Sequence, residues 1–291
     1  ERLVSFHISS MKSENKTPIF LVGCPRSGTT LLQSLLAAHP KICSFPESKF
    51  FECLTPTNNY FAKQLGLASR RLKPRMQVFF DEIKRPELLK TMPNSLFARD
   101  YPQSFINILN NLTRQQNKKV WIEKTPGHLF CIEEIEHYFP NAKFIHLYRQ
   151  GTDVAASLYE VTQKYPKAWG GQPWDIERCI DLWIQSMCIT NSYMGRSSHL
   201  AITYEALVAD TRTSMKKLCS FIEVEFSESM ILDYQTSSVS LALSQVGRTV
   251  NSVIKSKNSE KFHALLSKEQ QKITIERIRK SNAHIPISAS S

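Results

Sequence analysis

Residues 23–30 read Gly-Cys-Pro-Arg-Ser-Gly-Thr-Thr, and this stretch decides the fold. An apolar run, Pro18 to Val22, precedes it, and an apolar periodic segment, Leu31 to His39, follows it. The pattern predicts a strand, a tight loop and a helix, with the two glycines holding the bend. Such a loop points several backbone N–H groups at one spot beside the positive end of a helix. It is therefore suited to bind a phosphate or a sulfate.

The spacing of the two glycines is close to the Walker A pattern of nucleotide-binding loops. One departure matters, because the lysine that should follow Gly28 is Thr29, and the cation comes earlier, at Arg26. In ATPases and kinases that lysine reaches the β- and γ-phosphates. The loop therefore favours a different anion over the triphosphate of ATP.

Strands and helices alternate along the rest of the chain. Further strands are predicted at 42–45, 120–124, 143–148 and 200–203, and helices at 127–138, 153–164, 173–193, 204–209, 213–221 and 260–280. This order predicts an α/β fold, with a P-loop-type central parallel sheet and helices on both faces. Ligands of such folds bind beyond the carboxyl ends of the strands, where the motifs of this chain fall.

The stretch between the second and third predicted strands is long for one connection. Prolines punctuate its short helical pieces, so we predict a helical insertion at about 52–118. It either covers the acceptor site or serves as plain scaffold, and both interpretations stay open. We expect residues 1–291 to form a single domain, with a polar arm or short helix at 1–16 and a loop at 236–257.

A second motif, Arg-Gln-Gly-Thr-Asp-Val-Ala-Ala-Ser at 149–157, directly follows the predicted strand 143–148. Arg149 offers a planar fork of donors and Ser157 adds a hydroxyl, which together suit a dianion. Asp153 is predicted to cap the next helix or to orient the arginine, since a carboxylate repels phosphate.

The two motifs together closely resemble those of sulfotransferases that use 3′-phosphoadenosine 5′-phosphosulfate (PAPS). Pro-Arg-Ser-Gly-Thr-Thr is similar to the family's 5′-phosphosulfate loop, and 149–157 is similar to its 3′-phosphate motif. The resemblance runs from about residue 18 to 225 and includes features of tyrosylprotein and bacterial-type sulfotransferases. It implies that the nucleotide is bound by Arg26, Ser27, Gly28, Thr29, Thr30, Arg149, Ser157, Tyr204 and Arg248.

Three candidate site residues, Lys124, Tyr204 and Arg248, lie outside the two main motifs. Glu-Lys-Thr-Pro at 123–126 stands where sulfotransferases carry a lysine near the leaving phosphate, which implies a catalytic role for Lys124 beside Arg26. Tyr204 follows a strand, as in members where a tyrosine lies near the adenine. The C-terminal loop departs from the family, so Arg248 is a candidate for the 3′-phosphate and a solvated loop charge is an equal alternative.

The general base has two candidates. Attack by an acceptor hydroxyl on sulfur requires removal of its proton. In cytosolic sulfotransferases a histidine follows Lys-Thr directly; here that place is Pro126, and His128 lies two residues later. Tyrosylprotein sulfotransferases use a glutamate at the end of the second strand, which matches Glu47. We favour Glu47, whose alternative role is a surface carboxylate or a salt bridge to Arg26.

The resemblance implies transfer of a sulfuryl group from PAPS to a hydroxyl by in-line displacement, with 3′-phosphoadenosine 5′-phosphate (PAP) as product. No metal is expected, because a sulfuryl group carries less charge than a phosphoryl group and the sequence has no Walker B aspartate. Two other functions stay open: a P-loop kinase for a small metabolite, and an inactive protein that binds the nucleotide or a sulfated glycan.

Charge, hydropathy and cysteine content indicate which kinds of partner and location to expect. The net charge is +11 with lysine and arginine scattered, which favours an anionic nucleotide and an acidic acceptor over nucleic acid. No apolar run predicts a membrane span. The seven cysteines form no C-x-x-C pair, which indicates reduced thiols and a cytoplasmic location, or the Golgi lumen if an N-terminal anchor was removed. The acceptor, whether small molecule, carrier-tethered chain, glycan or peptide tyrosine, and the oligomeric state are not predicted.

Overall fold

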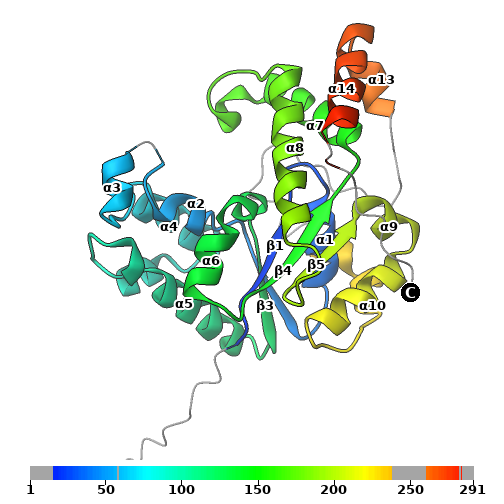
Figure 1. The fold of residues 1–291 in the computed structure, drawn as a ribbon. Helices are drawn as coiled ribbons and strands as arrows, with labels where there is room; N and C mark the ends of the chain where they lie inside the picture. Colours follow the sequence, from blue (N-terminus) through cyan, green and yellow to red (C-terminus); the bar gives the residue numbers. More distant parts are fainter. Residues whose placement is uncertain (1–15, 58, 238–259, 282, 284–291) are drawn as a thin grey trace, which may run out of the picture.

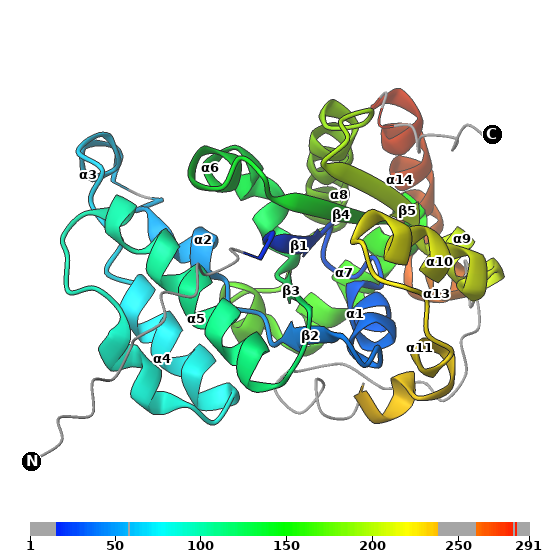
Figure 2. The same ribbon diagram turned by 90° about the horizontal axis from the view of Figure 1, so that it is seen from below.

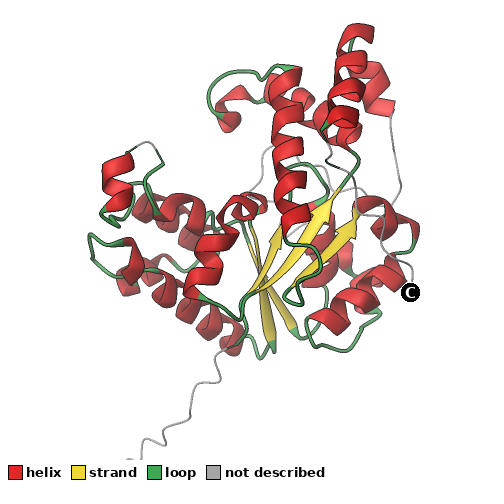
Figure 3. Ribbon diagram, viewed as in Figure 1, coloured by secondary structure: helices red, strands yellow, loops and turns green. Residues whose placement is uncertain are grey.

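The computed structural model describes residues 16–57, 59–237, 260–281 and 283. Its centre is a five-stranded parallel sheet in the order β2-β3-β1-β4-β5 (Figures 1 and 3). The strands are β1 (Ile19–Val22), β2 (Ile42–Phe45), β3 (Val120–Lys124), β4 (Lys143–Tyr148) and β5 (His199–Thr203). The predicted α/β fold with a parallel sheet is therefore confirmed, with β1 in the middle.

Helices cover both faces of this sheet (Figure 2). They are α1 (Thr29–Ala37), α2 (Phe50–Leu54), α3 (Tyr60–Gln64), α4 (Leu72–Glu82), α5 (Pro102–Gln115), α6 (Ile132–Tyr138), α7 (Gly151–Lys164), α8 (Ile176–Ser192), α9 (Tyr204–Ala209), α10 (Thr211–Phe221), α11 (Ser229–Leu232), α13 (Glu260–Leu265) and α14 (Lys268–Lys280). Short 3₁₀ helices are η1 (Pro86–Thr91), η2 (Ala98–Asp100), η3 (Pro126–Cys131) and η4 (Pro166–Trp169).

Alternating side chains of each strand enter different cores, because successive residues of a strand point to opposite faces. On β1, Phe20 packs with the helical insertion, whereas Leu21 packs with α1 and α10. On β3, Trp121 belongs to the first core and Ile122 to the second. The strands are buried on both faces, as expected of a parallel sheet flanked by helices.

The region predicted as a helical insertion contains α2 to α5 and packs directly on the sheet. Phe50 of α2 stacks on Phe105 of α5 with ring centroids 4.3 Å apart, and Phe79 of α4 meets Phe105 at 5.9 Å. These rings share one buried cluster with Phe20 of β1 and Phe45 of β2. The insertion and the sheet therefore share one core, which ties the insertion to the strand ends.

Three predicted helices differ from the structure by an internal break or by a start more than two residues away. The helix expected at 260–280 is two helices, α13 and α14, because Ser267 forms a capping box with Gln270 and starts a new helix. The helix expected from 127 begins as the 3₁₀ turn η3 and becomes α-helical only in α6. The helix expected from 173 begins at Ile176, after Asp175 accepts a hydrogen bond from the N–H of Arg178.

Two predicted segments and one site residue lie largely or wholly outside the described residues: the arm at 1–16, the loop at 236–257, and Arg248 within that loop. Across the ranges that the structure describes, no helix is both long enough and apolar enough to cross a membrane.

Candidate active site

The loop 23–30 leaves the carboxyl end of β1 and enters α1 at Thr29. Gly28 has a φ of 97°, and a Cβ placed there would lie 2.4 Å from the ring of Tyr204. Glycine is therefore required both by the backbone and by the close approach of the tyrosine. Ser27 lies fully buried in the bend, and its Oγ has no hydrogen-bond partner among the described residues.

The structure brings the two motifs together. Arg26 in the loop donates from Nε to Oγ of Ser157 on α7, over 3.1 Å. This contact joins the ends of two neighbouring strands, because β1 pairs with β4 and the motif 149–157 follows β4. Both sequence motifs therefore line one site at the carboxyl ends of the strands.

Arg149 is held in place from three sides. Asp153 accepts from its guanidinium over 2.9 Å, which confirms the orienting role expected for this carboxylate and not the cap. The guanidinium lies over the ring of Tyr204 at 4.3 Å, and the indole of Trp183 donates to the Arg149 carbonyl over 2.9 Å. Its Nε is buried and has no hydrogen-bond partner within the described part of the chain.

These features fit an anionic nucleotide. A buried donor without a partner costs free energy unless a ligand or water satisfies it, and the site has two, on Ser27 and Arg149. The N–H groups of a glycine-bearing loop at a helix start add further donors for an anion. Tyr204 bridges the two halves of the site, since it contacts Gly28 in the loop and Arg149 beyond β4.

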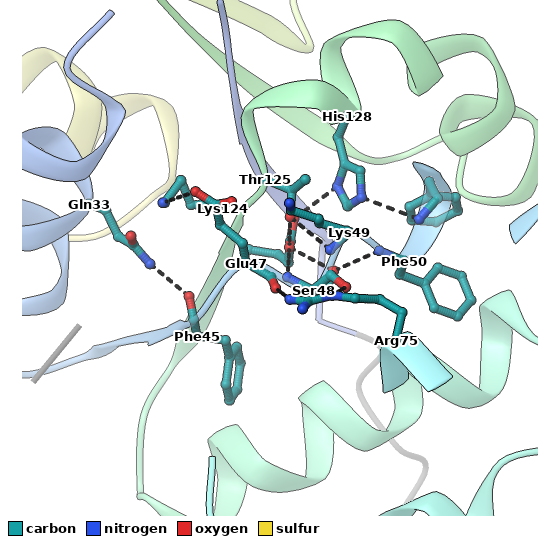
Figure 4. A network of polar contacts seen from close by, with 12 residues as sticks. Gln33, Phe45, Glu47, Ser48, Lys49, Phe50, Arg75, Lys124, Thr125 and His128 are labelled. Atoms are coloured by element: carbon teal, nitrogen blue, oxygen red, sulfur yellow. Dashed lines mark hydrogen bonds and ion pairs between the residues drawn. The ribbon is translucent and has the colours of Figure 1, made fainter. Parts of the chain in front are cut away.

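A buried ion pair lies on the other side of the loop. Lys124 ends β3, where its neighbour across the ladder is Leu21 of β1. Its side chain is fully buried, and its Nζ lies 2.6 Å from Oε1 of Glu47, whose side chain is 15% exposed (Figure 4). The predicted lysine and the favoured base are therefore in direct contact.

His128, the other candidate base, is fully buried, and each of its ring nitrogens faces another protein group. Its Nε2 accepts from the backbone N–H of Phe51 over 3.2 Å. Its Nδ1 lies 2.9 Å from Oε2 of Glu123, so Nδ1 carries the proton of this tautomer. The ring has no free nitrogen for an acceptor hydroxyl in this arrangement.

Sequence reasoning missed the residues that hold Glu47. Glu123 is fully buried beside Lys124, and its Oε1 accepts from Oγ of Ser48 over 2.7 Å. Burial raises the pKa of the Glu123 carboxyl, but the neighbouring imidazole and the hydroxyls of Thr125 and Ser48 outweigh it, so the pKa lies below its usual value. An acidic residue within a strand buried on both faces is a signal that could have found it.

The site thus has two chemically different sides. One side gathers Arg26, Arg149 and the loop N–H groups, which suit phosphate and sulfate. The other presents Glu47 beside Lys124, a carboxylate that can take a proton and a cation that can neutralise developing charge.

Comparison with known proteins agrees with this arrangement. The model of the sulfotransferase family matches residues 18–228. A Caenorhabditis elegans protein-tyrosine sulfotransferase A is 23% identical over 89% of this chain and 64% of its own length. A Gallus gallus protein-tyrosine sulfotransferase 2 is 24% identical over 88% of this chain and 65% of its own length. The chain therefore spans slightly less than two thirds of these curated relatives.

Solved structures show the same fold. The sulfotransferase domain of a Synechococcus olefin synthase superposes with a TM-score of 0.61, at 23% identity, over 92% of this chain and 97% of that domain. A mouse sulfotransferase complexed with PAP superposes with a TM-score of 0.50, at 16% identity, over 91% of this chain and 83% of that protein. With a family match that covers most of its length, this chain belongs to the sulfotransferase family.

Proposed function

We propose that this protein transfers a sulfuryl group from PAPS to a hydroxyl group of an acceptor. The observation that carries the proposal is the contact between Arg26 and Ser157, because it joins a loop for one anion to a motif for a second. A nucleotide with a phosphosulfate at one end and a 3′-phosphate at the other needs such a pair of neighbouring sites. The PAP complex of the mouse structural neighbour is in accord with this choice of nucleotide.

The residues that would hold the donor follow from the two sides of the site. Ser27, Thr29, Thr30 and the loop N–H groups would bind the phosphosulfate, together with Arg26. Arg149 and Ser157 would bind the 3′-phosphate, and Tyr204 would lie against the adenine. We retain Arg248 as a further candidate for the 3′-phosphate.

Glu47 and Lys124 would carry out the transfer. When bound, PAPS supplies the sulfuryl group and leaves as PAP. Glu47 would accept the proton of the hydroxyl as the new oxygen–sulfur bond forms and the sulfur–oxygen bond to the 5′-phosphate breaks. Lys124, with Arg26, would neutralise the charge that develops on the bridging oxygen. We assign the base to Glu47 and not to His128, because Glu47 lies beside Lys124 and is partly exposed.

We propose that the insertion at 52–118 covers the acceptor side, since α2 begins three residues after Glu47 and packs on η3. The curated relatives are named for protein tyrosine, and one structural neighbour is a domain of an olefin synthase. A tyrosine peptide and a carrier-linked hydroxyl are therefore the first acceptors to test, with a phenol and a sugar beside them.

The direct test is transfer of labelled sulfate from PAPS to this panel, with Mg²⁺ and with a chelator. We expect at least one sulfated acceptor, equal rates under both conditions, and a rate at least about 10²-fold lower but still measurable in Glu47→Gln. Phosphate transfer from ATP that needs Mg²⁺, without sulfate transfer, would establish the kinase alternative instead. PAP or glycan binding without any transfer would establish the inactive binder.

We also propose a cytoplasmic location, because all seven cysteines are unpaired in the structure. When the protein is purified without reductant and then denatured, titration of its thiols should find seven free cysteines. Disulfide-linked cysteines in the native cellular protein would contradict it.

A further inference from the structure

In the part of the chain that the structure describes, the polar partners of the Glu123 carboxylate are Ser48, Thr125 and His128, and one of its oxygens accepts three hydrogen bonds. Its Oε1 accepts from the backbone N–H of Ser48 over 3.0 Å, from Oγ of Ser48 over 2.7 Å, and from Oγ1 of Thr125 over 2.6 Å. Its Oε2 faces Nδ1 of His128 at 2.9 Å. Three hydrogen bonds to Oε1 and the ion-pair contact of Oε2 with the imidazole together allow a charge to be buried here.

Four consecutive backbone N–H groups lead to this one carboxylate. That of Ser48 bonds Glu123 directly, and that of Lys49 donates over 3.1 Å to Thr125 Oγ1. The N–H of Phe50 donates over 3.1 Å to Ser48 Oγ. The fourth, of Phe51, donates to His128 Nε2. Each of the three indirect bonds passes through a side chain that itself contacts Glu123.

These N–H groups belong to the start of α2, which begins at Phe50. The first N–H groups of a helix have no partner inside the helix, and a carboxylate near them is favourable. The cap residue Lys49 contributes no side-chain bond of its own. Glu123 and its three intermediaries therefore fix the segment that directly follows Glu47.

The backbone carbonyl groups of the same segment are also hydrogen-bonded. The guanidinium of Arg75 on α4 donates to the carbonyl of Ser48 over 2.8 Å and also to the carbonyl of Glu47. On the far side of Glu47, Gln33 of α1 donates to the carbonyl of Phe45 over 2.7 Å. The backbone around Glu47 is thus bonded to α1, β3 and α4.

Glu123 and Lys124 are adjacent in β3, which links the hydrogen bonds around Ser48 to the position of Glu47. Because side chains alternate along β3, Glu123 enters the network on the insertion side while Lys124 reaches Glu47. Two adjacent residues of β3 therefore fix the proposed base: Lys124 contacts the Glu47 side chain, and Glu123 binds the backbone that follows Glu47. A misplacement of about 1 Å in a reacting group costs about 10²-fold in rate.

We propose that Glu123 is a positioning residue, which acts through Ser48, Thr125 and His128 to aim Glu47 at the acceptor hydroxyl. The inference rests on the proposed function, since it concerns the base of that reaction. His128 is thereby a link in the network, bonded between Glu123 and the N–H of Phe51.

The variant Thr125→Val tests this role with little change in volume. It removes the hydroxyl that joins Lys49 N–H to Glu123, so we expect kcat to fall about tenfold while the Kd for PAP stays within about twofold. Thr125→Ser keeps the hydroxyl and should recover most of the lost kcat. Glu123→Gln removes the charge and should lower kcat further, by about 10²-fold.

A matched control separates positioning from general destabilisation. Asn110→Ala removes a different buried bond beside β3, in which Trp121 Nε1 donates to Asn110 Oδ1 over 2.7 Å. It should lower the unfolding temperature and leave kcat unchanged at a temperature where the protein is folded. A kcat loss in Asn110→Ala equal to that in Thr125→Val would overturn the proposal.

The decisive arm combines Thr125→Val with Glu47→Gln. If Glu123 acts through Glu47, the valine should cost no further activity once the base is absent, so the two losses should not multiply. Multiplicative losses would overturn the proposal. A wild-type protein that transfers no sulfate would instead refute the proposed function. The network around Glu123 would then be tested by hydrogen exchange alone.

Hydrogen exchange supplies a readout that needs no acceptor. In Thr125→Val the amide of Lys49 should exchange at least tenfold faster than in wild type, because it donates to the hydroxyl that the valine removes. In Glu123→Gln the amide of Ser48, which donates to the changed carboxylate, should also exchange at least tenfold faster. The amides of α1 and α7 should stay as in wild type. Unchanged exchange of the Lys49 amide in Thr125→Val would refute the network even if Glu123→Gln failed to fold.

Discussion

The nucleotide side and the base side of the site are built in different ways. The nucleotide side consists of two short segments, 23–30 at the start of α1 and 149–157 at the start of α7, and each carries its own glycine or fork of donors. The base side depends on contacts between distant segments: Ser48 bonds Glu123 across 75 positions, and Lys124 bonds Glu47 across 77.

Because of this difference, we expect substitutions on the two sides to change different measured quantities. Damage to a local loop should weaken nucleotide binding, because the loop supplies the donors directly. Damage to the long-range network should lower turnover and leave nucleotide affinity in place, because the network aims the base and its lysine. Among the described residues, the backbone N–H of Gly23 in the loop donates to the carbonyl of Pro126, just after Lys124, and so joins the two sides.

The largest effect is expected at Lys124. Lys124→Met keeps most of the buried volume and removes the cation, so we predict a fall in kcat of about 10²–10³-fold in steady-state sulfate transfer. The affinity for PAP, measured by calorimetry, should change far less.

Lys143→Met is the matched control for that variant, since it removes another lysine of the sheet, at the start of β4, which pairs with Glu223 at 2.6 Å. It should keep wild-type kcat. Wild-type turnover in Lys124→Met would contradict the division between the two sides.

A smaller effect, of the opposite kind, is expected at Gly28. A Cβ in Gly28→Ala would lie 2.4 Å from the Tyr204 ring, at a φ of 97° that costs an L residue about 1–2 kcal/mol. The ring must shift, so we predict about tenfold weaker PAP binding by calorimetry.

Gly170→Ala controls for backbone strain alone. Gly170 has a φ of 99°, and nothing lies within 4 Å of a Cβ placed there. This variant should lose stability but bind PAP as wild type does. Equal affinities in the two alanine variants would refute the role of the contact between Gly28 and Tyr204.

The smallest effect concerns neither side. Burial, with the nearby His199, lowers the pKa of His146 to about 3, while an unfolded histidine titrates near 6.5. Between pH 6.5 and about pH 3 the unfolded chain binds a proton at His146 that the folded chain does not. The free energy of unfolding therefore falls as the pH falls, by at most about 1.4 kcal/mol per pH unit.

Urea unfolding at pH 7 and pH 5 measures this slope. His146→Asn should flatten it in part, because His39 and His199 also have lowered pKa values and contribute with the same sign. An unchanged slope in the variant would contradict the burial of a neutral imidazole at this position.

The sequence predicted the sheet and the nucleotide side because both are encoded locally. Apolar runs mark buried strands, and the glycines and arginine of 23–30 specify a bend that needs no distant partner. The helix break at Ser267 was missed, because a capping serine within a continuous amphipathic pattern gives only a weak signal.

The base side was predicted only in part. Glu47 and Lys124 were named separately, by resemblance, but their contact depends on a register between β2 and β3 that no local pattern specifies. The same applies to Glu123, whose partners lie on three segments. His128 was named as a candidate base, whereas the structure places it between Glu123 and Phe51.

The most direct test of the central claim, that two anion sites hold the two ends of one nucleotide, compares PAP with adenosine 5′-phosphate by calorimetry. Wild type should bind PAP at least about tenfold more tightly, without Mg²⁺, because Arg149 and Ser157 engage the 3′-phosphate. Arg149→Ala should bind both nucleotides equally. A preference for PAP that survives in Arg149→Ala, or a wild type that binds only ATP with Mg²⁺, would contradict the claim.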